Sequence, residues 1–187
     1  MINKNTLISV SALLAISLGV LSTLTILSNG NTLTPENKMP DAIMNDVTAT
    51  IYDKMGKVSM RIVTPKLVHY TQQDATDFNN PVVTLYRNSL QPWVINANFA
   101  ESTNGLDNVK FWDNVTVHHP ASEDNPATII KTTTLTVHPN LQTAETPALI
   151  TLIQPNITVN AIGMTADMNS GDIHLLSQAR GEYAPTS

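Results

Sequence analysis

Residues 93–117 read WVINANFAESTNGLDNVKFWDNVTV, and this stretch decides the fold. Its opening residues, WVINA, place hydrophobic side chains at every second position, which predicts a β-strand with one buried face. Asn104-Gly105 is typical of a hairpin turn, because both residue types adopt positive φ readily. Asp113-Asn114 predicts a corner between two further strands. The stretch therefore reads as strand, turn, strand, corner and strand.

The same pattern continues on both sides of this stretch, and from residue 44 onward no segment has helical spacing. Residues 157–176 repeat it, with Gly163 as the corner and Ser170-Gly171 in the turn. Turn residues recur every 8–12 positions or so, as in all-β sandwiches, barrels and rolls. We predict an all-β domain of two-strand units that wind along one axis.

One face of these strands is hydrophobic, and the opposite face is mostly Thr, Asn, Lys, Asp and Ser. The hydrophobic face holds Val47, Ala49, Ile51, Val83, Leu85, Trp93, Ile95, Ala97, Val109, Phe111, Val115, Val117, Ile157, Val159, Ala161, Ile173 and Leu175. One apolar face per strand indicates two facing sheets or one folded sheet. Composition alone favours a closed core. The alternative is a roll whose interior stays open for acyl chains, and the pattern does not separate the two.

The N-terminal region predicts a membrane anchor, because no charged residue occurs between Thr6 and Leu27. A helix needs about 20 such residues to cross the hydrocarbon core. We expect residues 1–5 in the cytoplasm, a transmembrane helix over 6–27, a linker over 28–43 and the β-domain over 44–187. A cleaved signal peptide is the alternative, although its apolar region is normally about 7–15 residues long.

Composition excludes several classes of function. The 187 residues carry a net charge of −5 with only ten Lys and Arg, which argues against nucleic-acid binding and a polybasic membrane clamp. There is no Cys, and no catalytic or phosphate-binding motif is present. The adjacent His118 and His119 point to opposite faces of a strand, so they cannot share a metal. We predict a non-enzymatic protein without a cofactor or metal.

Several phrases, in this order, resemble the LptC family, the bitopic component of the bacterial lipopolysaccharide export bridge. They are the N-terminal anchor, Tyr52 to Gly56 with Arg61, 78–83 (FNNPVV), 93–97 (WVINA), 113–115 (DNV), Gly163-Met164, 173–176 (IHLL) and 180–183 (RGEY). The likeness covers essentially the whole chain. The Asp113-Asn114 corner departs from the family, in which a Gly is more usual there.

The resemblance implies a twisted antiparallel β-jellyroll with an open apolar groove through which lipopolysaccharide acyl chains pass. It implies pairing of the N-terminal edge with the inner-membrane ABC exporter and of the C-terminal edge with the soluble bridge protein LptA. The expected partner-edge residues are Gly56, Arg61, Gly163, Met164 and Arg180. The expected groove residues are Val47, Ala49, Ile51, Phe78, Val83, Leu85, Trp93, Ile95, Ala97, Val109, Phe111, Ile173, Leu175 and Tyr183.

The sequence is compatible with three functions. A lipid conduit in the inner membrane and periplasm follows from the resemblance and from the one-sided strands. A structural tether that only pairs its edges with partner proteins requires a filled interior. An anchored hydrolase requires an acid–base cluster, which the sequence does not offer.

Overall fold

The computed structural model describes residues 39–86, 91–122 and 126–184. These belong to one compact unit, residues 39–187, and a second unit spans residues 1–38. The predicted anchor at 6–27 lies outside the described residues. Within the described ranges, no helix has the length and hydrophobicity needed to cross a membrane.

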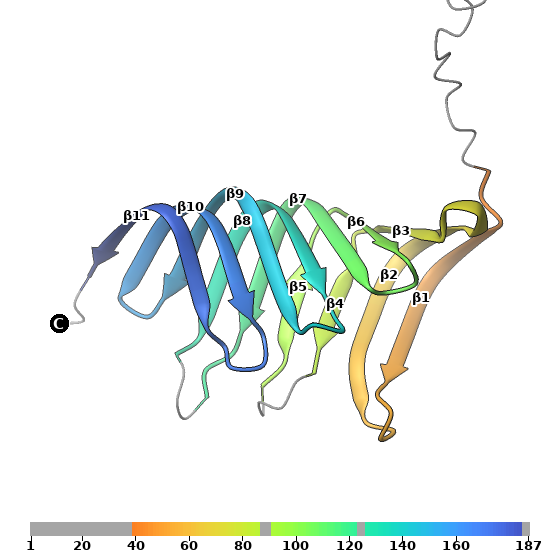
Figure 1. The fold of residues 1–187 in the computed structure, drawn as a ribbon, viewed down its shortest axis with the longest axis horizontal. Coiled ribbons are helices and arrows are strands. Elements are labelled where there is room, and N and C mark those ends of the chain that lie inside the picture. Colours follow the sequence, from red (N-terminus) through yellow and green to blue (C-terminus); the bar gives the residue numbers. More distant parts are fainter. Residues whose placement is uncertain (1–38, 87–90, 123–125, 185–187) are drawn as a thin grey trace, which may run out of the picture. The chain divides into compact units, whose positions relative to one another are not determined.

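The described unit is built from one antiparallel sheet of 11 strands (Figure 1). The strands are β1 (Ala42–Tyr52), β2 (Val58–Tyr70), β3 (Ala75–Asn79), β4 (Val82–Leu85), β5 (Trp93–Asn96), β6 (Phe99–Thr103), β7 (Asn108–His119), β8 (Thr128–His138), β9 (Thr143–Gln154), β10 (Ile157–Asp167) and β11 (Ile173–Tyr183). A short 3-10 helix, Thr71–Gln73, joins β2 to β3. The strands lie side by side in Figure 1 from β1 (orange) to β11 (blue).

The pairing pattern folds this sheet into two layers. β4 pairs with the first half of β2 and β3 with its second half. In the same way, β6 pairs with the first half of β7 and β5 with its second half. We therefore describe β3 with β4, and β5 with β6, as two halves of bent strands. The "β4–β5 layer" and the "β3–β6 layer" denote these strands together with the halves of the long strands beside them.

Left-handed backbone residues bend several of the long strands between the layers. Asp46 on β1 (φ 52°), Asp113 on β7 (φ 62°), Gly163 on β10 (φ 76°) and Gln178 on β11 (φ 51°) all have positive φ within a strand. The register also shifts at the bends of β7 and β10. These bends confirm the two predicted corners, at Asp113-Asn114 and at Gly163.

Buried threonines occupy the bends of β2, β8 and β9. The Thr64 hydroxyl lies 2.6 Å from the Asn79 carbonyl oxygen, and the Thr132 hydroxyl lies 3.0 Å from that of Leu149. Thr146 Oγ1 accepts a hydrogen bond from the Ala148 N–H at 3.1 Å. These hydroxyls bond backbone groups where the strands bend, because a buried backbone group without a partner is destabilising.

The sequence therefore predicted the fold class and misjudged strand length. Residues 58–62 and 66–70 form the single strand β2, and 157–161 and 164–168 fall largely in β10. The predicted strand 93–99 is divided instead, into β5 and β6. A bent strand interrupts its own alternation at the corner, so its two halves resemble separate strands. β1 begins at Ala42, inside the expected linker.

Candidate functional site: the interior between the layers

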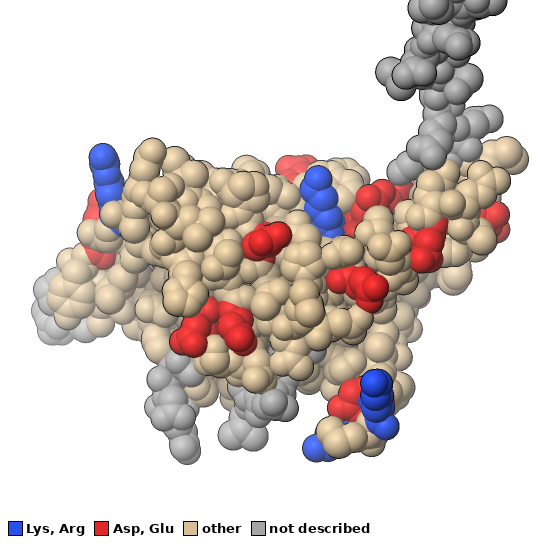
Figure 2. Space-filling view, in the orientation of Figure 1, with Lys and Arg blue, Asp and Glu red and all other residues tan. Residues whose placement is uncertain are grey.

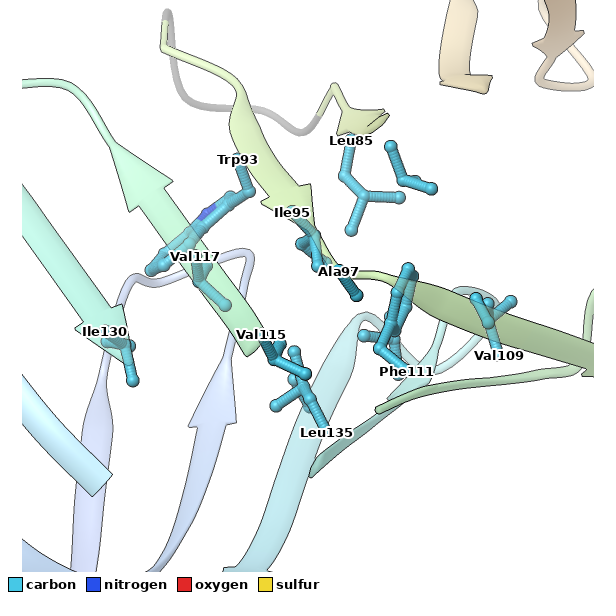
Figure 3. Close-up of a cluster of buried hydrophobic side chains, with 14 of the residues drawn as sticks. Leu85, Trp93, Ile95, Ala97, Val109, Phe111, Val115, Val117, Ile130 and Leu135 are labelled. Atoms are coloured by element: carbon cyan, nitrogen blue, oxygen red, sulfur yellow. The ribbon is translucent and has the colours of Figure 1, made fainter. Parts of the chain in front are cut away.

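Most of the predicted groove residues lie on the inner faces of the two layers (Figure 3). Eight of them are buried in one hydrophobic cluster: Phe78, Val83, Leu85, Trp93, Ile95, Ala97, Val109 and Phe111. Four are half-buried against it on the outermost strands: Ala49 and Ile51 on β1, and Ile173 and Leu175 on β11. The structure thus brings residues from all along the chain onto one continuous inner surface.

The remaining two predicted groove residues lie on the outermost strands. Val47 on β1 is half-buried and pairs with Thr64, which is buried. Tyr183 on β11 is 69% exposed and pairs with Ile157, two positions from the half-buried Val159. Paired residues of an antiparallel ladder share a face. Both side chains therefore lie on the inner side of the sheet, and no further described strand covers Tyr183.

Inner-face pairs form rows that run across the sheet. One row passes through Ala49, Ile62, Val83, Ile95, Val117, Ile130, Leu152, Val159 and Gly181, and so reaches from β1 to β11. Each residue in the row is the register partner of the next, so the apolar surface continues across every strand that the row crosses. An apolar track therefore connects the two edges of the sheet.

Side chains fill the middle of the interior. The cavity among Ile95, Val117, Ile130 and Leu135 has a volume of about 10 Å³, which is at the limit for a single water molecule. Phe111 and Leu85, which belong to the same core cluster, are almost fully buried. The two layers therefore pack directly on each other in the middle of the domain, as the closed-core interpretation expects.

Two larger cavities lie at the mouth, which we define as the opening between the free ends of the two layers, opposite the bends. The first, about 680 Å³, lies between Ile51 and Met60 of one layer and Leu106 and Pro139 of the other. The second, about 270 Å³, lies between β7, β8 and β9 on one side and residues 171–175 on the other. The interior is therefore accessible near both ends of the sheet.

A hydrogen bond joins the two layers at the mouth. Trp93 Nε1 donates to the Met168 carbonyl oxygen at 3.2 Å, and the Met168 side chain is buried in the core cluster. Trp93 also lines the second cavity. Opening of the mouth at this point requires this bond to break.

His119 is a buried titratable group at the edge of the second cavity. Its side chain is 5% exposed, and its ring lies 4.4 Å from that of Trp93, centroid to centroid. Burial lowers the pKa of His119, and the nearby His118 lowers it further. The imidazole is therefore neutral at pH 7.

This lowered pKa predicts a pH-dependent stability. The unfolded chain binds the His119 proton with an ordinary pKa of about 6.5, whereas the folded chain resists protonation. Above about pH 6.5, His119 therefore does not reduce the free energy of unfolding. Below that pH, the free energy of unfolding decreases as the pH approaches the lowered pKa of the folded state. We expect the midpoint temperature of thermal unfolding to decrease when the pH is lowered from about 7.5 to about 5.5. In H119L this decrease should be smaller. H174Q, a change of an exposed histidine, serves as the control. An unchanged decrease in H119L would contradict this assignment.

Two of the five predicted partner-edge residues lie in a turn or on an outermost strand, and three lie on strands that are paired on both sides. Gly56 lies in the β1–β2 turn and Arg180 lies on β11, the outermost strand at its end of the sheet. Arg61 pairs with residues of both β1 and β4. Gly163 and Met164 are on β10, which is paired on both sides. The exposed strands at the two ends are β1 and β11.

Positive charge is sparse on the described surface that faces the viewer in Figure 2. Figure 2 shows Asp and Glu distributed over this face, with Lys and Arg at only a few positions. Among the described residues, no group of three His, Asp or Glu side chains could hold a metal ion. His138 instead contacts Asn108 at 2.7 Å and Glu145 at 3.6 Å.

Bent antiparallel strands with an apolar inner face make this domain an antiparallel β-roll. The fold is similar to the crystal structure of LptH, the LptA-homologous periplasmic component of the lipopolysaccharide transport device of Pseudomonas aeruginosa, with a TM-score of 0.54. That match covers 67% of this chain and 95% of LptH at 11% identity, so it concerns the fold alone. Residues 9–184 match the sequence profile of the family described as lipopolysaccharide-assembly, LptC-related. The chain belongs to the LptC family. The comparison with curated proteins returned no match.

Proposed function

We propose that this protein is a segment of the lipopolysaccharide export bridge and carries acyl chains between its two layers. It receives lipopolysaccharide from the inner-membrane ABC exporter at β1 and passes it to LptA at β11. The observation that carries the proposal is the apolar track from Ala49 to Gly181, which runs from one edge strand to the other. Residues 6–27 anchor the chain in the inner membrane, and the β-domain lies in the periplasm.

The two edge strands support the proposed partner contacts. β1 pairs only with β2 and β11 only with β10 among the described strands. β1 exposes Ile43 and Met44, and β11 is exposed from Leu176 to Tyr183. An edge strand presents unpaired N–H and C=O groups that can add a strand from another protein. Addition of similar rolls at both edges would extend the apolar track.

Lipid entry requires the two layers to separate, because the middle of the interior is filled. Backbone hydrogen bonds run within the sheet, whereas the middle of the interior is closed by side-chain packing. The mouth can therefore widen while the strand ladders stay intact. Acyl chains would replace the lost core contacts by burying their own apolar surface, at about 25 cal/mol per Å².

Photo-crosslinking in cells tests this proposal. A photoreactive residue at Phe78, in the β3–β6 layer, or at Ile95, in the β4–β5 layer, is expected to capture lipopolysaccharide. The same residue at Asn96 is the matched control, because Asn96 is adjacent to Ile95 and exposed on the outer face. Capture at Asn96 without capture at either inner position would refute the conduit.

A structural tether is the second candidate, and the filled interior favours it. A tether would bind the exporter and LptA through β1 and β11 and would carry no lipid. It predicts no capture at Phe78 or Ile95 in cells where both partners are bound.

A further inference from the structure

The inner face is not uniformly apolar. In the row nearest the mouth of the β4–β5 layer, Met60, Leu85 and Trp93 are apolar partners on β2, β4 and β5. On β7, β8 and β9 the corresponding positions are polar: His119 pairs with Thr128, and Thr128 bonds to Gln154. In the half of the mouth toward β11, the outermost inner-face positions are therefore polar, and the positions deeper in the interior are apolar. We call His119, Thr128 and Gln154 the polar border.

The 270 Å³ cavity lies directly at this border. Its apolar wall includes Leu152, Val159 and Leu175, and its polar lining includes His119, Thr128, Gln154 and Asp172. Such a lining suits a ligand that has an alkyl chain on one side and a polar group on the other.

Hydrogen bonding in the cavity is incomplete among the described residues. Gln154 Nε2 donates to Thr128 Oγ1 at 3.0 Å, and Thr128 Oγ1 donates to the Pro126 carbonyl oxygen at 3.1 Å. In the described part of the chain, neither the His119 imidazole nor Gln154 Oε1 has a hydrogen-bond partner. A buried polar group left without a partner destabilises the fold, because it has lost its hydrogen bonds to water. The His119 ring is therefore poised to bond a ligand group.

We propose that this cavity binds a neutral hydroxyl group of an amphiphile, with His119 and Gln154 as its hydrogen-bonding residues. The alkyl chain of the ligand lies against Leu152, Val159 and Leu175. This inference rests on the proposed function, since it assigns one position in the lipid path to the polar part of the cargo.

The charges at the cavity favour a neutral group over a phosphate. Asp172 is the charged residue in the lining, and its Oδ2 accepts a hydrogen bond from the Ser170 hydroxyl at 2.8 Å. A phosphate here would meet this carboxylate without an Arg or Lys in the lining. A neutral imidazole, by contrast, can both donate to and accept from a hydroxyl.

Native mass spectrometry of the purified full-length chain tests this assignment with two matched probes. The first is N-tetradecanoylglucosamine, whose hydroxyls are all on the sugar. The second is N-(3-hydroxytetradecanoyl)glucosamine, which adds one hydroxyl on the chain. We expect H119L to weaken binding of at least one probe by roughly two- to tenfold, as loss of a single hydrogen bond does. Q154L, a change of a half-buried residue, is expected to have the same effect.

The pattern of losses identifies the source of the hydroxyl. Weaker binding of both probes assigns the sugar hydroxyl, and weaker binding of the second probe alone assigns the chain hydroxyl. S102A is the control, because Ser102 is a buried polar residue of the other layer that does not line this cavity. Unchanged binding of both probes to folded H119L and Q154L would overturn this site and leave the conduit standing. Failure of both probes to bind the unmodified chain would instead count against the conduit itself.

Discussion

Replacement of Phe111 by alanine is expected to lower the free energy of unfolding by about 3–5 kcal/mol. Phe111 is 1% exposed and pairs with Ala100 on β6 and Leu135 on β8. The small Ala100 beside it cannot fill the space that the ring leaves. The surrounding ladders also limit collapse, because their backbone hydrogen bonds fix the strand positions. The cavity therefore remains, and the lost packing adds to the lost burial.

Phe99→Ala is the matched control for this prediction. Phe99 lies on the adjacent strand β6, is 40% exposed and stacks on Trp112 at 6.0 Å between ring centroids. We expect F99A to cost about 1 kcal/mol, as loss of an exposed aromatic pair does. Thermal unfolding of the full-length chain, followed by tryptophan fluorescence, should give a lower midpoint for F111A by about 6–20 °C. Equal shifts for the two variants would show that the interior at Phe111 is not tightly packed.

The inner face could be predicted from the sequence because period-two alternation follows directly from strand geometry. Ile95, Val117 and Leu85 lie where the alternation places them. Tyr183 shows the limit of this reasoning, since its inner-side register follows only from its pairing with Ile157 across the hairpin. Whether the interior is open or filled depends on how closely side chains of the two layers pack against each other. These side chains are far apart in the sequence, so a local pattern does not predict their packing.

The polar border of the second cavity was not predicted from the sequence. His119 and Gln154 are far apart in the chain and come together only through the register of β7, β8 and β9. The adjacent histidines gave one usable signal, because two neighbours on a strand must face opposite sides and one of them therefore faces inward. Joined strands such as β2 were also missed, since the bends at buried threonines such as Thr64 carry no Gly or Asn to mark them.

Gly163→Ala is expected to destabilise the fold by about 2–4 kcal/mol, through backbone strain and a steric clash together. Gly163 has φ +76°, and a Cβ added there would lie 2.9 Å from Leu176 Cδ1 and 3.2 Å from Leu176 Cβ. The Leu176 tip can rotate away, but its Cβ is fixed to the backbone of β11. β11 must therefore shift relative to β10.

Gly56→Ala separates the two contributions. Gly56 has nearly the same backbone conformation, φ +77°, but no atom lies within 4 Å of the added Cβ. We expect G56A to cost only the left-handed backbone strain, about 1–2 kcal/mol. The double variant G163A/L176A should recover part of the difference, since it removes Cδ1 and Cγ of Leu176. Urea unfolding of G163A, G56A, G163A/L176A and L176A measures the loss of unfolding free energy in each variant. Equal losses in G163A and G56A would exclude the clash.

The clash at Gly163 also has a functional consequence that the turn substitution lacks. A shifted β11 changes the edge at which we propose that LptA adds its strand. G163A should therefore weaken LptA binding to the full-length chain more than G56A does, when both are compared at a temperature where each remains folded. Equal LptA affinity of the two variants would mean that the partner does not pair with β11, because G56A leaves that strand untouched.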